Sequence, residues 1–394
     1  MLRAGKIALL VILLAGLLSP AAAWRIDQES EGTYKGYTLT ENVFVDGHFR
    51  VRQYIDDRDY NSDIGAYETM EMRAALGFRA MPHEDYVFRI KVQESRELGT
   101  TKSNSPSTSQ ATFHEAYVVG RNLFGTPLAL QVGRFEMMYG DRRFIGNGAW
   151  NNYGPRTFDG FRLMMRNEDL YNMHFIYVKT RERGFSNVEF NQPYQYGANS
   201  EHSPFDEQMF GFMGWVYDHM FWPVMMFTWD QEHGSGTDAD FYGTFGTYAE
   251  NSYDSGIFWD LDAYYQFGTK ANRDLASYLI GMDVGYAMKE MESKPKFQLG
   301  FEMSSASDVV DYTSGEEDAS FYAPYRSKHY FAGWLDQFNS DTAPYRTYGL
   351  TDIHAKFNIK PGKLNLTVQW LMFMVGNDEA FVNADGENYS NLGQ

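Results

Sequence analysis

The sequence predicts an all-β fold, a transmembrane antiparallel β-barrel of the outer-membrane type with an export signal in front of it. Three observations predict this class. Apolar and polar residues alternate at period two through about fifteen segments, short turns alternate with long loops, and one apolar run stands at the N-terminus. The composition agrees, because 17% of the 394 residues are aromatic while the mean hydropathy is still −0.47. An apolar outer face with a polar lumen produces this combination.

The N-terminal segment has the three parts of a secretory signal peptide. Basic residues precede the apolar run Ile7–Leu18, and small residues follow it up to a cleavage point near Ala23-Trp24. The run is shorter than the ~20 residues that a membrane-spanning helix needs. The predicted domains are the signal peptide 1–23, a periplasmic N-terminal segment 24–40 and the transmembrane barrel 41–394.

The alternation is clear after residue 85, where Tyr86, Phe88 and Ile90 alternate with Arg89 and Lys91. Such patterns are typical of half-buried antiparallel strands. A soluble propeller or β-helix would show a repeat of fixed period, and the sequence has none. The predicted strands are 41–56, 66–80, 85–97, 111–121, 126–137, 158–167, 170–182, 207–218, 222–232, 240–250, 255–268, 275–289, 294–306, 347–359 and 362–376.

The connections place the barrel in the membrane. Short turns such as 82–84 and 360–362 all fall on one rim, whereas nearly all the long connections fall on the other. Outer-membrane barrels have short periplasmic turns and long extracellular loops. A chain that starts at the periplasmic rim must return to that rim, so a closed barrel needs an even number of strands. The fifteen predicted strands end at the opposite rim. We therefore expect one to three C-terminal strands to be missing, with 16–18 strands in the full barrel and a natural C-terminus beyond Gln394.

Composition excludes several classes of function. The chain has no cysteine, so it can form neither a disulfide nor a thiolate metal site. A net charge of −18 argues against nucleic-acid binding, which needs clustered Lys and Arg. No Gly-x-Ser-x-Gly, HExxH or EF-hand pattern occurs, so we expect no enzyme, no catalytic residue, no cofactor and no metal.

The charge is divided unevenly along the chain. Residues 41–166 carry 16 Lys+Arg and 16 Asp+Glu, whereas residues 167–394 carry 14 against 33. Most of the later acidic residues fall in predicted outer loops. There they form a solvated rim, bridge to lipopolysaccharide through divalent cations, or filter ions electrostatically at the mouth of the pore. Inward-facing acids are expected from the later strands at Asp260, Asp262, Asp283, Glu302 and Asp352.

Basic residues are predicted to line the lumen of the first half. By alternation the inward set is Arg50, Arg52, Arg73, Arg79, Arg89, Lys91, Arg162 and Arg166. Arg134 shares the parity of Val132, so it reaches the lumen only if the strand is bulged. Two outcomes stay open: the cations are neutralised by nearby carboxylates, or unpaired cations at a constriction select anions.

The long loop 138–157 adds the predicted constriction. It contains Arg142, Arg143 and Arg156 together with Trp150 and Tyr153. Folded into the lumen, such a loop offers arginines for carboxylates and aromatic rings for sugars. The alternative is an ordinary loop at the rim.

The segment from Gly133 to Leu163 resembles the signature of the alginate export porin family, and shorter stretches 114–118 and 328–336 are also similar to it. The resemblance implies an 18-stranded outer-membrane barrel whose arginine-rich constriction passes an anionic polysaccharide. The matching positions are Gly133, Arg134, Gly140, Asp141, Arg143, Trp150, Arg156, Phe158, Asp159, Gly160 and Arg162.

These observations predict a bacterial outer-membrane porin for the passive transport of small anionic solutes or acidic saccharides. Its partners would be outer-membrane lipid, lipopolysaccharide and the solute, with no nucleic acid; the oligomeric state stays open. The alternative is a structural or adhesive barrel that transports nothing and displays acidic surface loops. Single-channel conductance and reversal potential in planar bilayers separate the two hypotheses.

Overall fold

The computed structural model describes residues 37–40, 42–56, 67–98, 111–146, 156–167, 170–181, 207–230, 240–270, 273–306, 319–323, 325–326 and 349–376. These residues contain sixteen strands and one short 3₁₀ helix, η2 Leu123–Gly125. Within them, no helix has both the length and the apolar character needed to cross a membrane. The described residues divide into two compact units, which are taken in turn.

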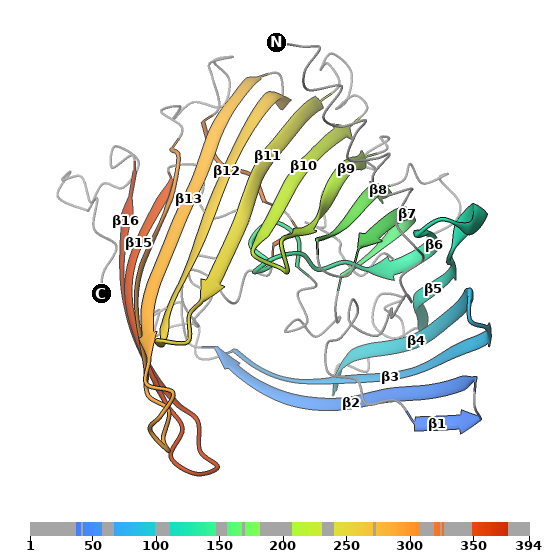
Figure 1. The fold of residues 1–394 in the computed structure, drawn as a ribbon, viewed down its shortest axis with the longest axis horizontal. Helices are drawn as coiled ribbons and strands as arrows, with labels where there is room; N and C mark the ends of the chain where they lie inside the picture. The colour runs from blue at the N-terminus through green and yellow to red at the C-terminus, as the bar shows by residue number, and fades with distance from the viewer. Residues whose placement is uncertain are drawn as a thin grey trace. The chain divides into compact units, whose positions relative to one another are not determined.

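The first unit contains the strands up to residue 165. Each strand pairs antiparallel with the next one along the chain, as the order of labels in Figure 1 shows. The strands are β1 Tyr37–Thr40, β2 Val43–Asp56, β3 Tyr67–His83, β4 Tyr86–Leu98, β5 Thr112–Gly120, β6 Leu128–Glu136 and β7 Thr157–Asn167, of which the last two residues belong to the second unit.

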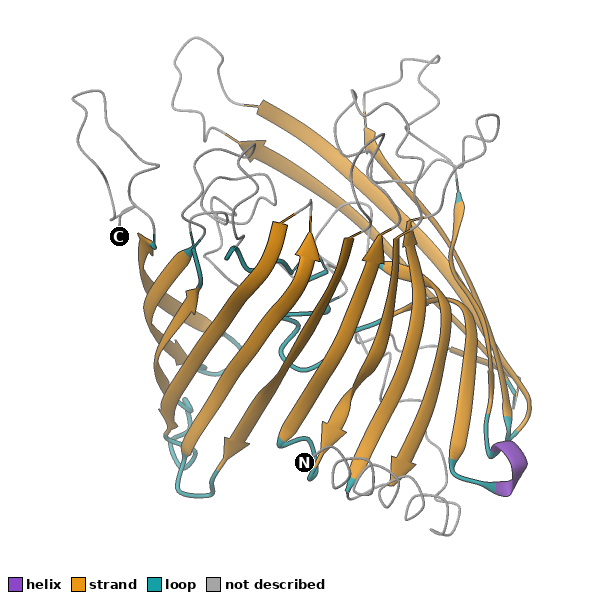
Figure 2. Cartoon of the chain, turned by 90° about the horizontal axis from the view of Figure 1, so that it is seen from above, coloured by secondary structure: helices purple, strands orange, loops and turns teal. Residues whose placement is uncertain are grey.

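The second unit contains the remaining strands together with the inter-strand segment Tyr139–Gly146. Its strands also pair with their neighbours in chain order, and tight turns join several of them (Figure 2). They are β8 Tyr171–Arg181, β9 Glu207–Val216, β10 Phe221–Asp230, β11 Asp240–Ser252, β12 Ile257–Lys270, β13 Arg273–Ala287, β14 Lys296–Ser304, β15 Leu350–Ile359 and β16 Leu366–Val375.

The fifteen predicted strands correspond one for one to β2–β16. The additional strand β1 falls in the segment 24–40, which we had expected to precede the barrel, and it pairs with β2. Its four residues are too few for an alternating pattern to stand out in the sequence.

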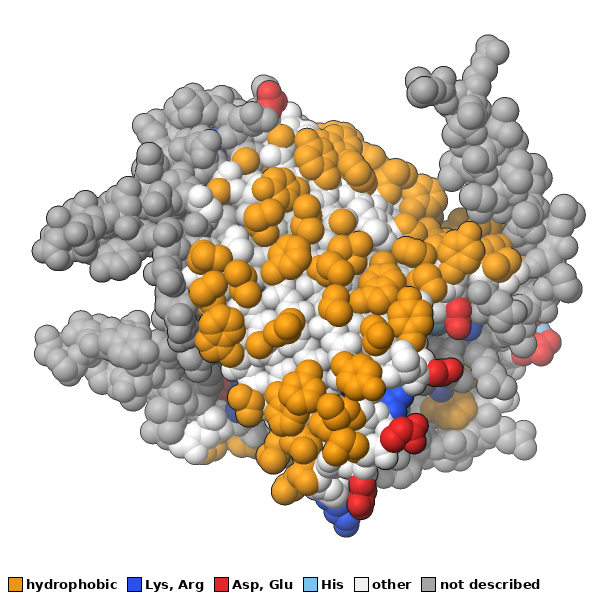
Figure 3. Space-filling view, turned by 60° about the vertical axis from the view of Figure 1, so that its left-hand side comes forward, with side chains coloured by type: hydrophobic (Ala, Val, Ile, Leu, Met, Phe, Trp, Pro, Cys, Tyr) orange, Lys and Arg blue, Asp and Glu red, His pale blue; other side chains and the backbone are white. Residues whose placement is uncertain are grey.

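Exposure along the strands is the reverse of that in a soluble protein. In β4 the side chains of Phe88 and Ile90 are 46% and 49% exposed, while those of Arg89 and Lys91 between them are buried. In β13 the same alternation exposes Met282 and buries Asp283. Figure 3 shows hydrophobic side chains gathered over a broad surface. This arrangement suits strands with an apolar face toward lipid and a polar face toward a lumen.

Gly133 in β6 allows two backbones to approach closely. Its φ is +127°, a conformation that L side chains rarely adopt, and a Cβ there would overlap the carbonyl oxygen of Ala116 on β5. We expect Gly133→Val to lower the free energy of unfolding by at least about 1–3 kcal/mol, measured by urea titration in lipid vesicles. Gly125→Ala is the matched control, because Gly125 also has a positive φ but no atom within 4 Å of its Cβ position. An equal loss in both variants would contradict the steric argument.

Candidate functional site

Among the residues that the structure describes, many cationic side chains gather on the inner face of the first unit. The alternation that exposes apolar residues places these groups together on the opposite face of the sheet. The cationic residues that sequence analysis predicted on this face are Arg50, Arg52, Arg73, Arg79, Arg89, Lys91 and Arg162. Carboxylates that bind members of this set include Asp46, Glu71, Glu115 and Glu136.

Arg89 joins three strands of this face. Its Nε donates to Glu115 of β5 at 3.1 Å, and its Nη2 donates to Asp46 Oδ1 of β2 at 2.9 Å. To reach Asp46 the guanidinium must cross β3, which it does over Gly77. A Cβ on Gly77 would lie 2.7 Å from Arg89 Nη2, so a side chain there would displace the guanidinium from its present position.

Lys91 and its neighbours extend the network. Lys91 Nζ is 3.1 Å from Glu136 and 3.9 Å from Glu115, and His114 Nε2 is 3.0 Å from the same Glu136 oxygen. Lys91 is 2% exposed, so these carboxylates hold a nearly fully buried ammonium group.

Other cations of this face have polar or aromatic partners. Arg52 Nε donates to Glu71 at 3.0 Å, and Arg73 Nε donates to His48 Nε2 at 3.0 Å. The remaining contacts are those of Arg162 Nη2 with Gln131 Oε1 at 2.7 Å and of the Arg79 guanidinium with the Phe44 ring at 4.8 Å from its centroid. Of the two outcomes left open by the sequence, pairing therefore holds for several of these cations.

Arg134 lies on the other face. Neither pairing of β6 has a register shift at Gly133, so Arg134 keeps the parity of the exposed Val132. Its Nε and Nη2 donate to the Asp159 carboxylate at 2.7 and 2.6 Å. The prediction that Arg134 lines the pore required a bulge that the strand does not form.

In the second unit, the segment Tyr139–Gly146 packs on the inner face of the strands. The hydroxyl of Tyr139 is 2.6 Å from His174 Nδ1 of β8, and the Phe144 ring stacks on Tyr264 of β12 with centroids 5.9 Å apart. Burial of Phe144 and Ile145 fixes the segment, which is the first part of the predicted constriction loop.

Two rows of side chains cross β12–β15 beneath this segment. In the first row Asp262, Gly281, Glu302 and Asp352 are register partners from strand to strand. In the adjacent row the partners are Asp260, Asp283, Gly300 and His354. These are the five acids that alternation predicted to face inward. Each row has one glycine, and the gap above each glycine is occupied by side chains from elsewhere in the cluster.

Arg143 occupies the gap in the first row. Its Nε lies 2.7 Å from Asp262 Oδ2 and 3.1 Å from Asp141 Oδ2, and its Nη1 contacts Glu302. A Cβ on Gly281 would be 3.8 Å from Arg143 Cζ, so the guanidinium lies directly over the glycine. Burial alone would lower the pKa of Arg143, but Asp262 and Asp141 raise it above its ordinary value, so this arginine stays charged.

His354 closes the gap in the second row. Its Nε2 lies 2.7 Å from Asp283 Oδ1, and its Nδ1 lies 3.2 Å from Asp352 Oδ2. A Cβ on Gly300 would overlap Asp283 Oδ1, so the contact between Asp283 and His354 requires this glycine. Asp262, Asp283 and Asp352 are all buried as a result.

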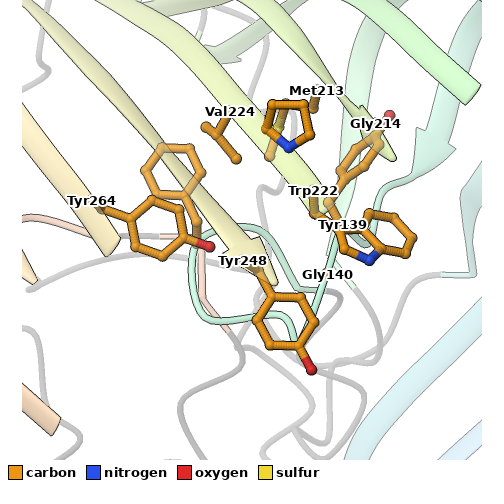
Figure 4. A pocket seen from close by; sticks show the side chains of 10 residues that line it. Tyr139, Gly140, Met213, Gly214, Trp222, Val224, Tyr248 and Tyr264 are labelled. Carbon is orange, nitrogen blue, oxygen red and sulfur yellow. The ribbon is translucent and has the colours of Figure 1, made fainter. Parts of the chain in front are cut away.

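A small aromatic pocket lies beside the segment (Figure 4). Its walls leave essentially no room for a water-sized sphere, whereas small-molecule sites typically enclose ~300–1,000 Å³. Its walls are formed by Tyr139, Gly140, Phe144, Met213, Gly214, Trp222, Pro223, Val224, Tyr248 and Tyr264. The pocket therefore serves to pack the segment against β9–β12 rather than to hold a solute.

A second inward segment was missed by sequence analysis. Residues 319–323 and 325–326 pack on the same face, where Tyr322 N donates to Gln266 Oε1 at 2.7 Å and Gln266 Nε2 donates to Tyr322 O at 2.7 Å. The backbone N of Gly146 donates to Tyr325 O at 2.8 Å and so connects the two segments. Loop residues have no period, so alternation gave no signal here; the buried aromatic Phe321 was the sole hint.

The other predicted residues are placed as follows. Arg142 lies half-buried beside Arg143, Arg156 is half-buried just before β7, and Arg166 is half-buried near the end of β7. The predicted constriction aromatics Trp150 and Tyr153 lie outside the described residues.

Metal ligation has one geometric candidate in the part of the chain that the structure describes. His83, Glu84 and Asp85 of the turn between β3 and β4 present ligand atoms within 4.8 Å of one another. Asp85 N already donates to His83 Nδ1 at 3.2 Å, and Asn122 Nδ2 donates to Asp85 at 2.6 Å. These groups stabilise an exposed turn, which is how acidic turn residues commonly act.

Solved outer-membrane porins share this fold. A doubly substituted variant of OccD1 (OprD) is 11% identical, with 86% of this chain and 77% of that chain covered and a TM-score of 0.51. OccK8 (OprE) of Pseudomonas aeruginosa is 11% identical, with 84% of each chain covered and a TM-score of 0.51. OpdO of Pseudomonas aeruginosa is 11% identical, with 85% and 82% covered and a TM-score of 0.50. The fold class is therefore the outer-membrane β-barrel of the porins.

The family follows from the sequence match. The profile of the family described as Alginate export matches residues 40–372, most of the chain. No protein of curated function matches the sequence. The chain belongs to the alginate export family, which confirms the resemblance seen around Gly133. It is a porin-like channel of the bacterial outer membrane, and its family and structural neighbours are channel proteins.

Proposed function

We propose that this porin gives passive passage to small anionic solutes or acidic saccharides through a lumen lined by arginine. One observation carries the proposal: the predicted inward arginines include several half-buried side chains, while three of the five predicted inward acids are buried. A solute in the lumen interacts most strongly with charges that it can approach.

The accessible cations come from several elements. The half-buried arginines of the predicted set are Arg50, Arg52, Arg79, Arg142, Arg156 and Arg166. The carboxylates of Asp262, Asp283 and Asp352 in the second unit are less accessible to a solute. Arg143 and His354 lie against them. Guanidinium groups suit carboxylates in particular, since their planar donors match both oxygens. Acidic saccharides carry such carboxylates.

Reversal potentials in planar bilayers test the proposal. With a KCl gradient at low ionic strength, we expect the purified full-length protein to form channels that pass chloride more readily than potassium. A carboxylated saccharide added on one side should reduce the chloride current more than a neutral saccharide of the same size.

The outcomes separate the competing functions. Cation selectivity would overturn the anionic solute while leaving a channel. Absence of any conductance from correctly folded protein would instead favour the structural or adhesive barrel that displays acidic loops.

A further inference from the structure

The gap above Gly281 has the properties of a socket for the guanidinium of Arg143. We define the socket as Asp262, Gly281 and Glu302, which follow one another across β12, β13 and β14. Carboxylates stand on both sides and glycine forms the floor, so the Arg143 guanidinium lies between them in ion-pair contact with both. Asp262 is fully buried beneath it.

Arg143 also makes charged contacts that join this segment to the sheet. The other contacts of Tyr139–Gly146 described above are aromatic stacking, the bond from Tyr139 to His174 and backbone bonds. Within the segment, the backbone N of Arg143 donates to Asp141 Oδ1 at 2.8 Å and Arg143 Nε donates to Asp141 Oδ2 at 3.1 Å. These bonds hold the arginine in position. The segment therefore presents a pre-ordered arginine to the socket.

We propose that Arg143 in this socket is a latch: it positions the segment Tyr139–Gly146 inside the lumen and so sets the conductance and the solute specificity of the pore. Arg143 acts here as a positioning residue rather than as a contact for the solute. The effect on conductance and specificity rests on the proposed channel function. The docking of the segment on the strands does not depend on that function.

A disulfide measures the docking without any transport. The chain has no cysteine, so an introduced pair is the only source of thiols. A Cβ on Gly140 would lie 3.2 Å from Tyr248 Cβ of β11, close to the ~3.5–4.5 Å of a disulfide. The variant Gly140→Cys with Tyr248→Cys should therefore cross-link under mild oxidation, and the rate should report how often the segment is docked.

Three further changes in the cysteine variant test the latch. Arg143→Ala should slow cross-linking by roughly fivefold, because the ion pairs with the buried Asp262 and with Glu302 are lost. Gly281→Val should slow it similarly by filling the socket with methyl groups. Arg143→Lys should give an intermediate rate, since an ammonium group lacks the planar fork that spans both carboxylates. Lys363→Ala, in the exposed turn between β15 and β16, is the control and should leave the rate unchanged.

Single-channel recording then tests the consequence. Arg143→Ala should raise conductance and its fluctuation, and the disulfide in the Arg143→Ala background should restore the smaller conductance until a reductant is added. Equal cross-linking rates with and without Arg143, in protein that Gly281→Val also leaves unaffected, would overturn the latch. Unchanged cross-linking rates would contradict the latch alone. Absent conductance would contradict the channel function alone.

Discussion

Replacement of Arg89 by methionine is expected to destabilise the barrel by about 3–5 kcal/mol, the usual cost of removing one partner from a buried ion pair. Arg89 is the shared partner of Asp46 and Glu115, whose side chains are 12% and 6% exposed. Without the guanidinium, both carboxylates would remain at a poorly solvated face with one cation fewer to stabilise them. Urea titration in phospholipid vesicles, followed by tryptophan fluorescence, gives the free energy of unfolding.

Two variants serve as controls for Arg89→Met. Adding Asp46→Asn and Glu115→Gln should recover most of the loss, because no buried carboxylate is then left without its cation. Lys289→Met in the exposed turn after β13 should change the free energy by less than about 0.5 kcal/mol. A loss below that of Lys289→Met would mean that the network contributes no stability.

Neutralising three accessible arginines is expected to reduce the preference for chloride over potassium by about tenfold. The variant carries Arg50→Gln, Arg52→Gln and Arg79→Gln on the inner face of the first unit. A unit charge about 8 Å from a passing ion in water changes its energy enough for roughly a twofold effect, in opposite directions for chloride and potassium. Three charges therefore change the ratio by at least about tenfold even after partial screening. Reversal potentials in a KCl gradient measure the ratio, at low salt so that screening does not hide it.

A matched variant with three acidic residues neutralised should shift the preference for chloride over potassium in the opposite direction and by a smaller amount. Asp260→Asn, Asp283→Asn and Asp352→Asn should raise the chloride preference, but by less, because Asp283 and Asp352 are buried against His354. If the acidic variant shifts the ratio more than the arginine variant, the accessible charge of the pore is acidic and the proposed anion specificity is wrong.

Alternation was sufficient to predict the strands and their faces. The fifteen predicted strands recur as β2–β16, and Arg89, Lys91 and Asp262 lie on the face that parity assigned to them. Period-two patterns work here because lipid and lumen make opposite demands on successive residues over nearly the whole length of each strand.

Parity could not predict which charges meet. Arg89 reaches across β3 over Gly77, which has no side chain, and Arg143 comes to β12–β14 from a segment far away in sequence. These contacts depend on strand register. An alternating pattern looks the same when one strand is shifted by two residues along its neighbour, so the pattern alone does not determine the register. The inward packing of residues 319–323 has the same origin, since it depends on Gln266 of β12.

The glycine gaps also bear on how the wall assembles. A wall of simple hairpins can add one hairpin at a time, since every backbone bond joins neighbours along the chain. Arg89 instead ties β2 to β5 over Gly77, and Arg143 bridges β12 and β14 over Gly281. The ion pairs of Arg89 can form only when β2–β5 are all in place, and those of Arg143 only when β12–β14 are in place. We therefore expect β2–β5 to become stable as one cooperative unit, and β12–β14 as another, rather than one hairpin at a time.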